Sequence, residues 1–151
     1  MLRLARLGLL GGLLFSQGDK IAFFQGDWEA LLEEAKKQHR PVFVDFYTTW
    51  CGPCKMLERY TFSDASVAAY VQANYLAYRV DCERGKGPML ANAFHVRAYP
   101  TIVFLSPEGK EMGRQVGFVD AATFLALLRR YRESTEYARP SSDLPKTHSA
   151  R

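Results

Sequence analysis

The sequence predicts a single α/β domain in which helices cover both faces of a central mixed β-sheet. Amphipathic helical segments alternate with short apolar strands along most of the chain. The strand over 42–47 is a nearly continuous run of β-branched and aromatic residues, which is typical of a strand buried on both faces. The strands over 101–105 and 111–116 are joined by the turn sequence Ser-Pro-Glu-Gly, so they form a hairpin and make the sheet mixed.

The first half of the domain is expected to begin with a short strand or lead-in over 19–24 and a helix over 28–38. Asp27 can cap that helix, because its carboxylate can accept hydrogen bonds from the first turn. The apolar residues of the helix recur at the spacing of one helical face: Trp28, Leu31, Leu32 and Ala35. Pro41 ends the helix, and the buried strand 42–47 follows it.

Two helical stretches follow the buried strand. A helix over 55–60 breaks near 61–63, where Ser63 or Asp64 can cap a further helix that ends near Asn74. The remaining predicted elements are a strand over 76–81, a loop over 83–88, a short helix over 89–94, the two hairpin strands, and a last helix that begins near Asp120.

The composition fits one globular domain with a core of its own. The chain has 151 residues, of which 48% are hydrophobic and 24% charged. The net charge is +4, and no run of lysines and arginines is interleaved with aromatic residues, so we expect no nucleic-acid partner. Residues 19–137 are expected to form the domain, and the polar segment 138–151, with two prolines, a disordered tail.

The segment 1–18 has the pattern of a signal peptide for export. Two arginines precede an uncharged stretch over 7–15, and small residues at 16 and 18 suit cleavage. The stretch is shorter than the roughly twenty apolar residues that span a membrane. We therefore expect a periplasmic or otherwise exported protein; the alternative is an uncleaved N-terminal segment that anchors the protein to a membrane.

Two cysteines carry the clearest chemical signal, because Cys51-Gly52-Pro53-Cys54 follows the buried strand and opens a helix. In thiol–disulfide exchange one thiolate attacks a disulfide, and a second thiol resolves the mixed disulfide. Unpaired N–H groups at the helix start favour the thiolate of Cys51, which we expect to be the more exposed of the pair. We therefore assign Cys51 as the nucleophile and Cys54, about one turn on, as the resolving thiol.

Other uses of a C-x-x-C segment fit less well. A zinc site usually recruits a second pair of ligands, and the remaining candidates, Cys82, His39, His95 and His148, are not paired at ligand spacing. A c-type haem site needs a histidine directly after Cys54, where Lys55 stands. We therefore expect a redox-active disulfide between Cys51 and Cys54 and no metal or other cofactor; metal binding and a merely structural pair remain the alternatives.

Three further residues deserve a hypothesis. Asp45 lies within the buried strand, where burial should raise its pKa and make it a proton acceptor for Cys54; the alternative is a surface position at the strand end. Pro100, in Tyr99-Pro100-Thr101, can follow a cis peptide bond or simply start a strand. Cys82 is expected to be a small semi-buried residue, with a regulatory or intermolecular disulfide as the alternative.

The chain resembles the thioredoxin superfamily over nearly all of 23–132. The motifs that carry the resemblance, in the family's order and approximate spacing, are Val44-Asp45-Phe46, Trp50-Cys51-Gly52-Pro53-Cys54-Lys55, Tyr99-Pro100-Thr101 and Val116-Gly117. The resemblance implies the thioredoxin fold, a cis peptide before Pro100 that faces the dithiol, and a buried acid at Asp45. It also implies a substrate groove formed by Trp50, Gly52, Pro53, Tyr99, Pro100 and Gly117. Ala77 stands where thioredoxins usually carry a lysine near the buried acid, which puts a proton relay through that lysine in doubt.

Within the superfamily, residues 55–67 and 117–127 are most similar to the C-terminal periplasmic domain of the disulfide reductase DsbD. The resemblance implies an enzyme of cell redox homeostasis, a thiol-disulfide oxidoreductase that reduces disulfides of exported proteins. Its electrons would come from a membrane protein or a thiol donor, and we expect it to be a monomer. The alternatives are a disulfide oxidase or isomerase, and a non-catalytic binding module in which the cysteines are idle.

Overall fold

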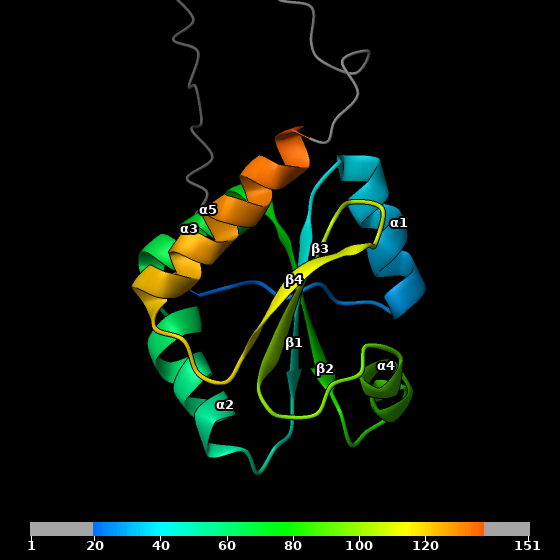
Figure 1. Ribbon diagram of the computed structural model, residues 1–151, viewed down its shortest axis with the longest axis vertical. Coiled ribbons are helices and arrows are strands. Elements are labelled where there is room, and N and C mark those ends of the chain that lie inside the picture. The colour runs from blue at the N-terminus through cyan, green and yellow to red at the C-terminus, as the bar shows by residue number, and fades with distance from the viewer. Residues whose placement is uncertain (1–19, 138–151) are drawn as a thin grey trace, which may run out of the picture.

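A four-stranded mixed sheet forms the centre of the computed structural model, which describes residues 20–137 (Figure 1). The elements in chain order are α1 (Trp28–Gln38), β1 (Val42–Tyr47), α2 (Gly52–Leu57), the π-helical turn η1 (Glu58–Phe62), α3 (Ala65–Asn74), β2 (Leu76–Asp81), α4 (Gly87–Ala93), β3 (Thr101–Leu105), β4 (Glu111–Val116) and α5 (Ala121–Tyr137). The predicted order of helices and strands is therefore confirmed.

The strand order in the sheet is β2-β1-β3-β4. β1 is parallel to β2 and antiparallel to β3, and β3 and β4 form the expected antiparallel hairpin. Five of the six β1 residues are fully buried, which fits a strand that has neighbours on both edges and helices on both faces.

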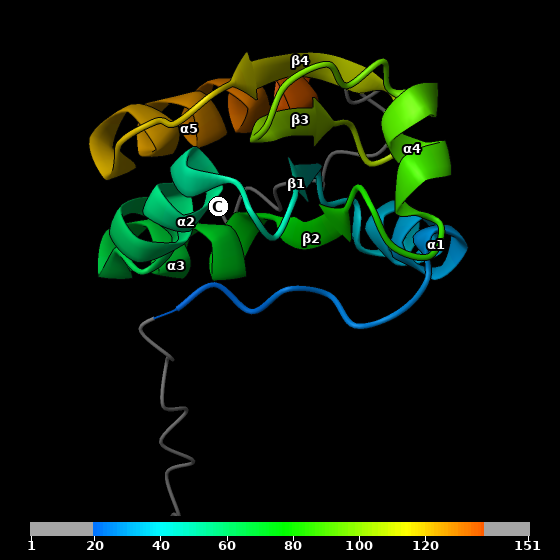
Figure 2. The ribbon, with the colours of Figure 1, turned by 90° about the horizontal axis from the view of Figure 1, so that it is seen from below.

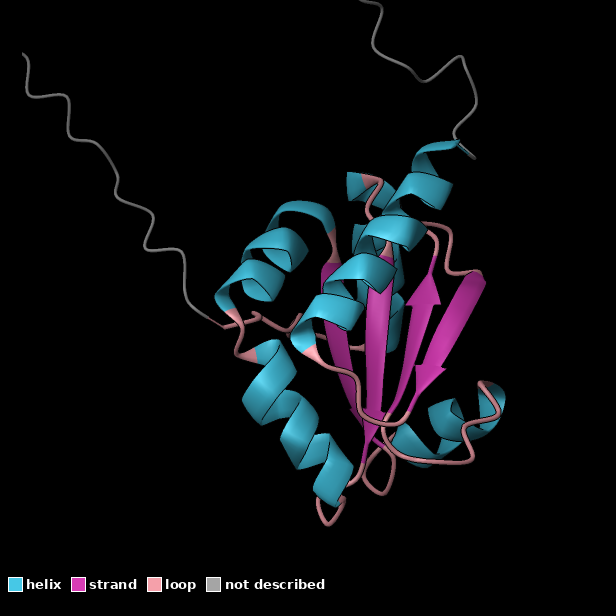
Figure 3. Cartoon of the chain, turned by 60° about the vertical axis from the view of Figure 1, so that its left-hand side comes forward, coloured by secondary structure: helices cyan, strands magenta, loops and turns pink. Residues whose placement is uncertain are grey.

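Helices cover both faces of the sheet, with α1 and α4 on one face and α2, α3 and α5 on the other (Figures 2 and 3). Side chains alternate along β1, as they do in any strand. Val42, Val44 and Phe46 belong to the hydrophobic cluster that also contains residues of α1 and α4. Phe43 belongs to the cluster that contains residues of α3 and α5, and Asp45 therefore points to this second face as well.

The helix caps follow the predicted pattern. Asp27 accepts a hydrogen bond from the backbone N–H of Ala30 at 2.9 Å. Of the two candidates for α3, Asp64 is the cap, and Asp120 caps the last helix by accepting from the N–H of Thr123 at 2.8 Å.

Three boundaries differ from the predicted ones. α4 begins at Gly87, two residues before the predicted start, because Pro88 suits the first turn of a helix. The helix predicted over 55–60 begins at Gly52 and continues through the π-helical turn to Phe62. In the described part of the lead-in, residues 20–24, one β-bridge forms, between Phe23 and Ala77.

The expected signal peptide over 1–18 and the expected disordered tail over 138–151 lie outside the described residues. The predicted domain boundaries at 19 and 137 stay predictions. Between residues 20 and 137, no helix is long and apolar enough to cross a membrane.

The core on the α3 and α5 face depends on Phe124, which is fully buried and packs edge-on against Phe43 with ring centroids 5.3 Å apart. We expect Phe124→Ala to lower the free energy of unfolding by about 3–5 kcal/mol, because it leaves a cavity among aromatic rings. Phe118→Ala is the matched control, since Phe118 is 37% exposed and its removal should cost less than about 1 kcal/mol. Urea unfolding measures both, and equal losses would contradict the assignment of this core.

Candidate redox-active site

Strand ends from the whole sheet meet at its lower edge in Figure 1. β1 and β2 are parallel and both end there, with Tyr47 opposite Asp81. β3 runs the other way and begins there, with Thr101 opposite both Phe46 and Val116. The segments that leave this edge carry the candidate residues Trp50, Cys51, Cys54, Cys82, Tyr99, Pro100 and Gly117.

The dithiol lies at the start of α2, and Cys51 and Cys54 form a disulfide. Cys51 is the N-cap residue, and the backbone N–H of Cys54 donates a hydrogen bond to its Sγ at 3.2 Å. The first turn of the helix therefore already directs an N–H donor at the sulfur that we assign as nucleophile. Both cysteines are buried in this disulfide form, at 4% exposure for Cys51 and 3% for Cys54, so the expected greater exposure of Cys51 stays a prediction.

Asp45 is buried in the middle of the sheet, with 1% exposure. Its Oδ2 accepts a hydrogen bond from Nε of Arg79 at 2.9 Å, whereas its Oδ1 is buried and has no hydrogen-bond partner within residues 20–137. Burial raises the pKa of Asp45 to about 6; the positive charge of Arg79 opposes this rise, and the carboxylate of Glu58 adds to it. The surface position considered for Asp45 is excluded.

Arg79 is a site residue that the sequence analysis missed. It stands opposite Asp45 in the parallel pairing of β1 and β2 and also forms an ion pair with Glu58. Ala77, at the position of the family's usual lysine, is 2% exposed and lies in the core. The cation beside the buried acid therefore comes from two residues further along the same strand, on the same face.

Two aromatic side chains lie beside the dithiol loop. Trp50 is 65% exposed, and its Nε1 donates to both carboxylate oxygens of Glu83 at 3.0 Å. Its ring packs edge-on against Tyr99, with centroids 6.2 Å apart. An exposed tryptophan held in place by a hydrogen bond and a ring contact offers a fixed apolar surface to a partner.

The Tyr99–Pro100 peptide bond is cis, as the resemblance implies. The N–H of Gly117 donates to the carbonyl oxygen of Pro100 at 2.8 Å, which ties the start of β3 to the residue after β4. Gly117 has a φ of 83°, a left-handed conformation that favours glycine. Gly52 and Pro53 are exposed in the first turn of α2, next to the disulfide.

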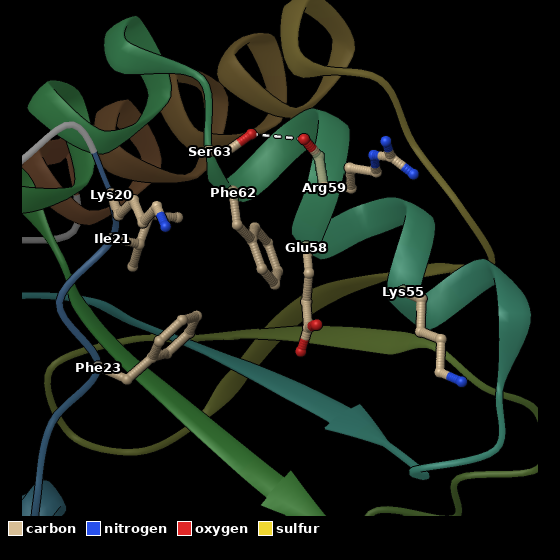
Figure 4. Close-up of a pocket in the computed structure, with 8 residues that line it drawn as sticks. All are labelled: Lys20, Ile21, Phe23, Lys55, Glu58, Arg59, Phe62 and Ser63. Atoms are coloured by element: carbon tan, nitrogen blue, oxygen red, sulfur yellow. Dashed lines mark hydrogen bonds between the residues drawn. The ribbon is translucent and has the colours of Figure 1, made fainter.

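A pocket of about 440 Å³ opens beside the dithiol helix (Figure 4). It is lined by Lys20, Ile21, Phe23, Lys55, Glu58, Arg59, Phe62 and Ser63. Glu58 extends from the helix toward the strands, and the rings of Phe23 and Phe62 lie on the other side of the opening. Since Glu58 pairs with Arg79, the pocket gives solvent a way to the outer end of the Asp45–Arg79–Glu58 chain.

Within the described residues, Cys82, His39 and His95 do not form a second site, and the candidate His148 lies outside those residues. Cys82 is a free thiol with 6% exposure, and burial raises its pKa to about 12, so it is a poor nucleophile at neutral pH. Within residues 20–137, no group of three or more histidine, cysteine, aspartate or glutamate side chains could hold a metal ion.

The comparisons with known proteins agree with this fold and this dithiol. Residues 28–132 match the family described as a thioredoxin-like domain. The chain belongs to the thioredoxin-like family. A solved thioredoxin from Thermus thermophilus is 25% identical, with a TM-score of 0.70 over 84% of this chain and 98% of that one. A putative disulphide-isomerase from Bacteroides thetaiotaomicron is 34% identical, with a TM-score of 0.64 over 83% of this chain and 100% of that one.

The resemblance to DsbD is also confirmed. The thiol:disulfide interchange protein DsbD of Yersinia pestis (strain Pestoides F) is 39% identical over 99 residues, which cover 63% of this chain and 16% of that protein. The chain thus spans about a sixth of the length of the curated relatives it matches. With its family and its C-x-x-C disulfide, this thioredoxin-like chain has the cysteine pair that thiol–disulfide exchange requires.

The buried Asp45 should make the stability of the oxidised protein depend on pH. Its pKa is about 6 in the folded chain against 3.8 as the ordinary value, so the unfolded chain loses this proton first, and folding becomes less favourable between about pH 4 and pH 6. Asp45→Asn removes this effect. We expect the stability of Asp45→Asn relative to the original chain to rise by about 2.5 kcal/mol from pH 4 to pH 7, at roughly 1.4 kcal/mol for each pKa unit.

Urea unfolding of the oxidised proteins at both pH values measures the difference. Asp120→Asn is the control, because hydrogen bonds from the backbone N–H groups of Thr123 and Ala122 lower the pKa of Asp120. The stability of Asp120→Asn relative to the original chain should therefore fall, not rise, as the pH increases. A stability difference for Asp45→Asn that stays the same at both pH values would show that this carboxyl group titrates normally.

Proposed function

We propose that this thioredoxin-like protein is a reductase that passes electrons from the Cys51/Cys54 dithiol to disulfides of other exported proteins. One observation carries the proposal: Cys51 caps a helix whose N–H group at Cys54 points at its sulfur. This arrangement stabilises a thiolate at the attacking position and keeps the second thiol within bonding distance.

The proposed reaction has two exchange steps. The thiolate of Cys51 attacks one sulfur of a substrate disulfide, a Cys51–substrate bond forms, and the other substrate sulfur leaves as a thiolate. Cys54 then loses its proton and attacks Sγ of Cys51, which releases the second substrate sulfur. Two electrons pass to the substrate, and the dithiol becomes the Cys51–Cys54 disulfide seen in the structure.

Asp45 is the proposed acceptor of the Cys54 proton. Asp45 lies on the face of the sheet that α2 covers, and Cys54 is buried on α2. Its Oδ1 is buried and has no hydrogen-bond partner in the described part of the chain, so this oxygen is free to take a proton. A pKa of about 6 suits a group that must gain and lose a proton near neutral pH.

The proposed substrate groove consists of Trp50, Gly52, Pro53, Tyr99, Pro100 and Gly117. The contact between Trp50 and Tyr99 and the hydrogen bond from Gly117 to Pro100 support it, because they fix parts of three loops at the same edge of the sheet. The exposed first turn of α2 leaves room for a partner chain next to the disulfide.

The proposed setting is the periplasm or another exported location, with a membrane protein or a thiol protein as electron donor and the enzyme acting as a monomer. The signal-like pattern over 1–18 and the similarity to thiol:disulfide interchange proteins support this setting. An uncleaved membrane-anchoring segment remains the alternative. Isomerase activity is a second candidate, favoured by the similarity to a putative disulphide-isomerase, of which 100% is covered by 83% of this chain.

Reduction of insulin disulfides with dithiothreitol as donor tests the proposal. We expect the full chain to accelerate the reduction, and we expect Cys51→Ser to lower the rate to that of dithiothreitol alone, because the attacking sulfur is gone. Cys54→Ser should accumulate a mixed disulfide through Cys51, visible by intact mass. Cys82→Ser is the matched control and should keep the original rate, since Cys82 is buried.

A purified chain that neither reduces insulin nor forms the mixed disulfide would refute the reductase proposal. A Cys51→Ser variant that keeps its partner binding and cellular role would instead identify a binding module.

A further inference from the structure

One arginine side chain connects a buried acid to an exposed one. Arg79 Nε lies 2.9 Å from Oδ2 of Asp45, and its Nη1 pairs with Oε1 of Glu58. Side-chain exposure rises along this chain, from 1% at Asp45 through 22% at Arg79 to 47% at Glu58. The three residues come from β1, β2 and η1, so the ion pairs join the sheet to the helix that carries the dithiol.

We propose that Arg79 is a positioning residue for the thiol chemistry: its guanidinium, held between Asp45 and Glu58, orients the Asp45 carboxylate as the proton acceptor for Cys54. This inference rests on the proposed function and adds a residue to it. The lysine position typical of the family is not used here, because it is Ala77.

The guanidinium is held from several sides. It lies over the ring of Tyr47 at 4.0 Å and near the ring of Phe23 at 5.4 Å, both favourable cation–π contacts. Tyr47 belongs to β1, and Phe23 to the segment that bridges to Ala77. Two carboxylates and two aromatic rings thus restrict the guanidinium, and lysine, as a flexible point charge, would not reproduce this arrangement.

The two ion pairs of Arg79 determine which oxygen of Asp45 is available for a proton. Oδ2 is engaged by Arg79, whereas Oδ1 is buried and has no hydrogen-bond partner in the described chain. Glu58 pairs with Nη1 of the guanidinium while Nε donates to Oδ2 of Asp45, so both carboxylates hold Arg79 in this position. The carboxylate therefore keeps one oxygen free for the proton of Cys54.

The charged groups around Asp45 come from different elements. Arg79 on β2 is the cation, Glu58 on η1 is the anion, and Cys82 after β2 is a neutral thiol whose pKa Asp45 helps to raise. Cys54 on α2 is the proposed proton donor. Since the positive charge of Arg79 opposes the effect of burial, removing it should raise the pKa of Asp45 further.

Titration of the Asp45 carboxyl carbon by NMR in the oxidised full chain tests the effect of Arg79 on Asp45 without any need for catalysis. We expect Arg79→Gln to move the titration midpoint of Asp45 up by about one pH unit or more, and Glu58→Gln to move it down. Arg114→Gln is the matched control, because Arg114 is ion-paired with Glu111 on β4 and should leave the midpoint unchanged. An Arg79→Gln midpoint equal to the original one overturns the inference.

Kinetics of the resolving step give the second readout. Reduced protein with excess 5,5′-dithiobis(2-nitrobenzoate) should release one thionitrobenzoate as Cys51 is modified and a second as Cys54 attacks, in a phase independent of reagent concentration. At a pH below the Asp45 midpoint, we expect Arg79→Gln to slow the second phase about tenfold for each pH unit by which it raises that midpoint. The rate of the second phase in Arg79→Lys should lie between the rates of the original chain and of Arg79→Gln. If Arg79→Gln does not fold, an Arg79→Lys profile that coincides with the original one overturns the inference.

The two experiments separate this inference from the proposed function. A second phase in Asp45→Asn that matches the original chain at every pH refutes Asp45 as the proton acceptor, whatever Arg79 does. If Asp45→Asn slows the second phase but Arg79→Gln leaves the titration midpoint of Asp45 unchanged, only the role of Arg79 is refuted.

Discussion

The pairing register between β1 and β2 puts Arg79 directly beside Asp45, and most of the site depends on it. A carboxylate buried at the centre of a sheet is costly unless a cation or hydrogen-bond donor faces it. The same register ends both strands at one edge, so that the N–H of Cys82 donates to the carbonyl oxygen of Tyr47 at 2.9 Å. A slip of one residue would turn Arg79 to the opposite face and leave Asp45 without its cation.

Much of the fold and the dithiol could be predicted from the sequence, because local signals determine them. The bounds of β1, β2, β3 and β4 agree with the predicted strand ranges, and acidic caps mark the starts of three helices. Arg79 was missed because its role depends on which strands are neighbours and in what register. The parallel order of β1 and β2, aligned from Val42 and Leu76, would have pointed to it.

The burial of both cysteines in the disulfide form could not be predicted, for a different reason. Helix geometry favours the first cysteine of a C-x-x-C segment as the more accessible one, but it does not determine how far the rest of the chain covers both residues, which are 4% and 3% exposed. The asymmetry between Cys51 and Cys54 therefore lies in the N–H donor that points at Cys51 and in the buried acid on the sheet face that α2 covers. Asp45 destabilises the fold when ionised, and such a cost is common at functional sites.

We propose that this thioredoxin-like dithiol donates electrons, although the exported location that we also propose is an environment that favours oxidation. Its reduction potential tests the claim most directly, measured by equilibrating Cys51 and Cys54 with dithiothreitol or glutathione buffers and counting free thiols by mass. We expect a value near that of thioredoxin, about −270 mV. A value near about −120 mV, as in a strong oxidant, would contradict it.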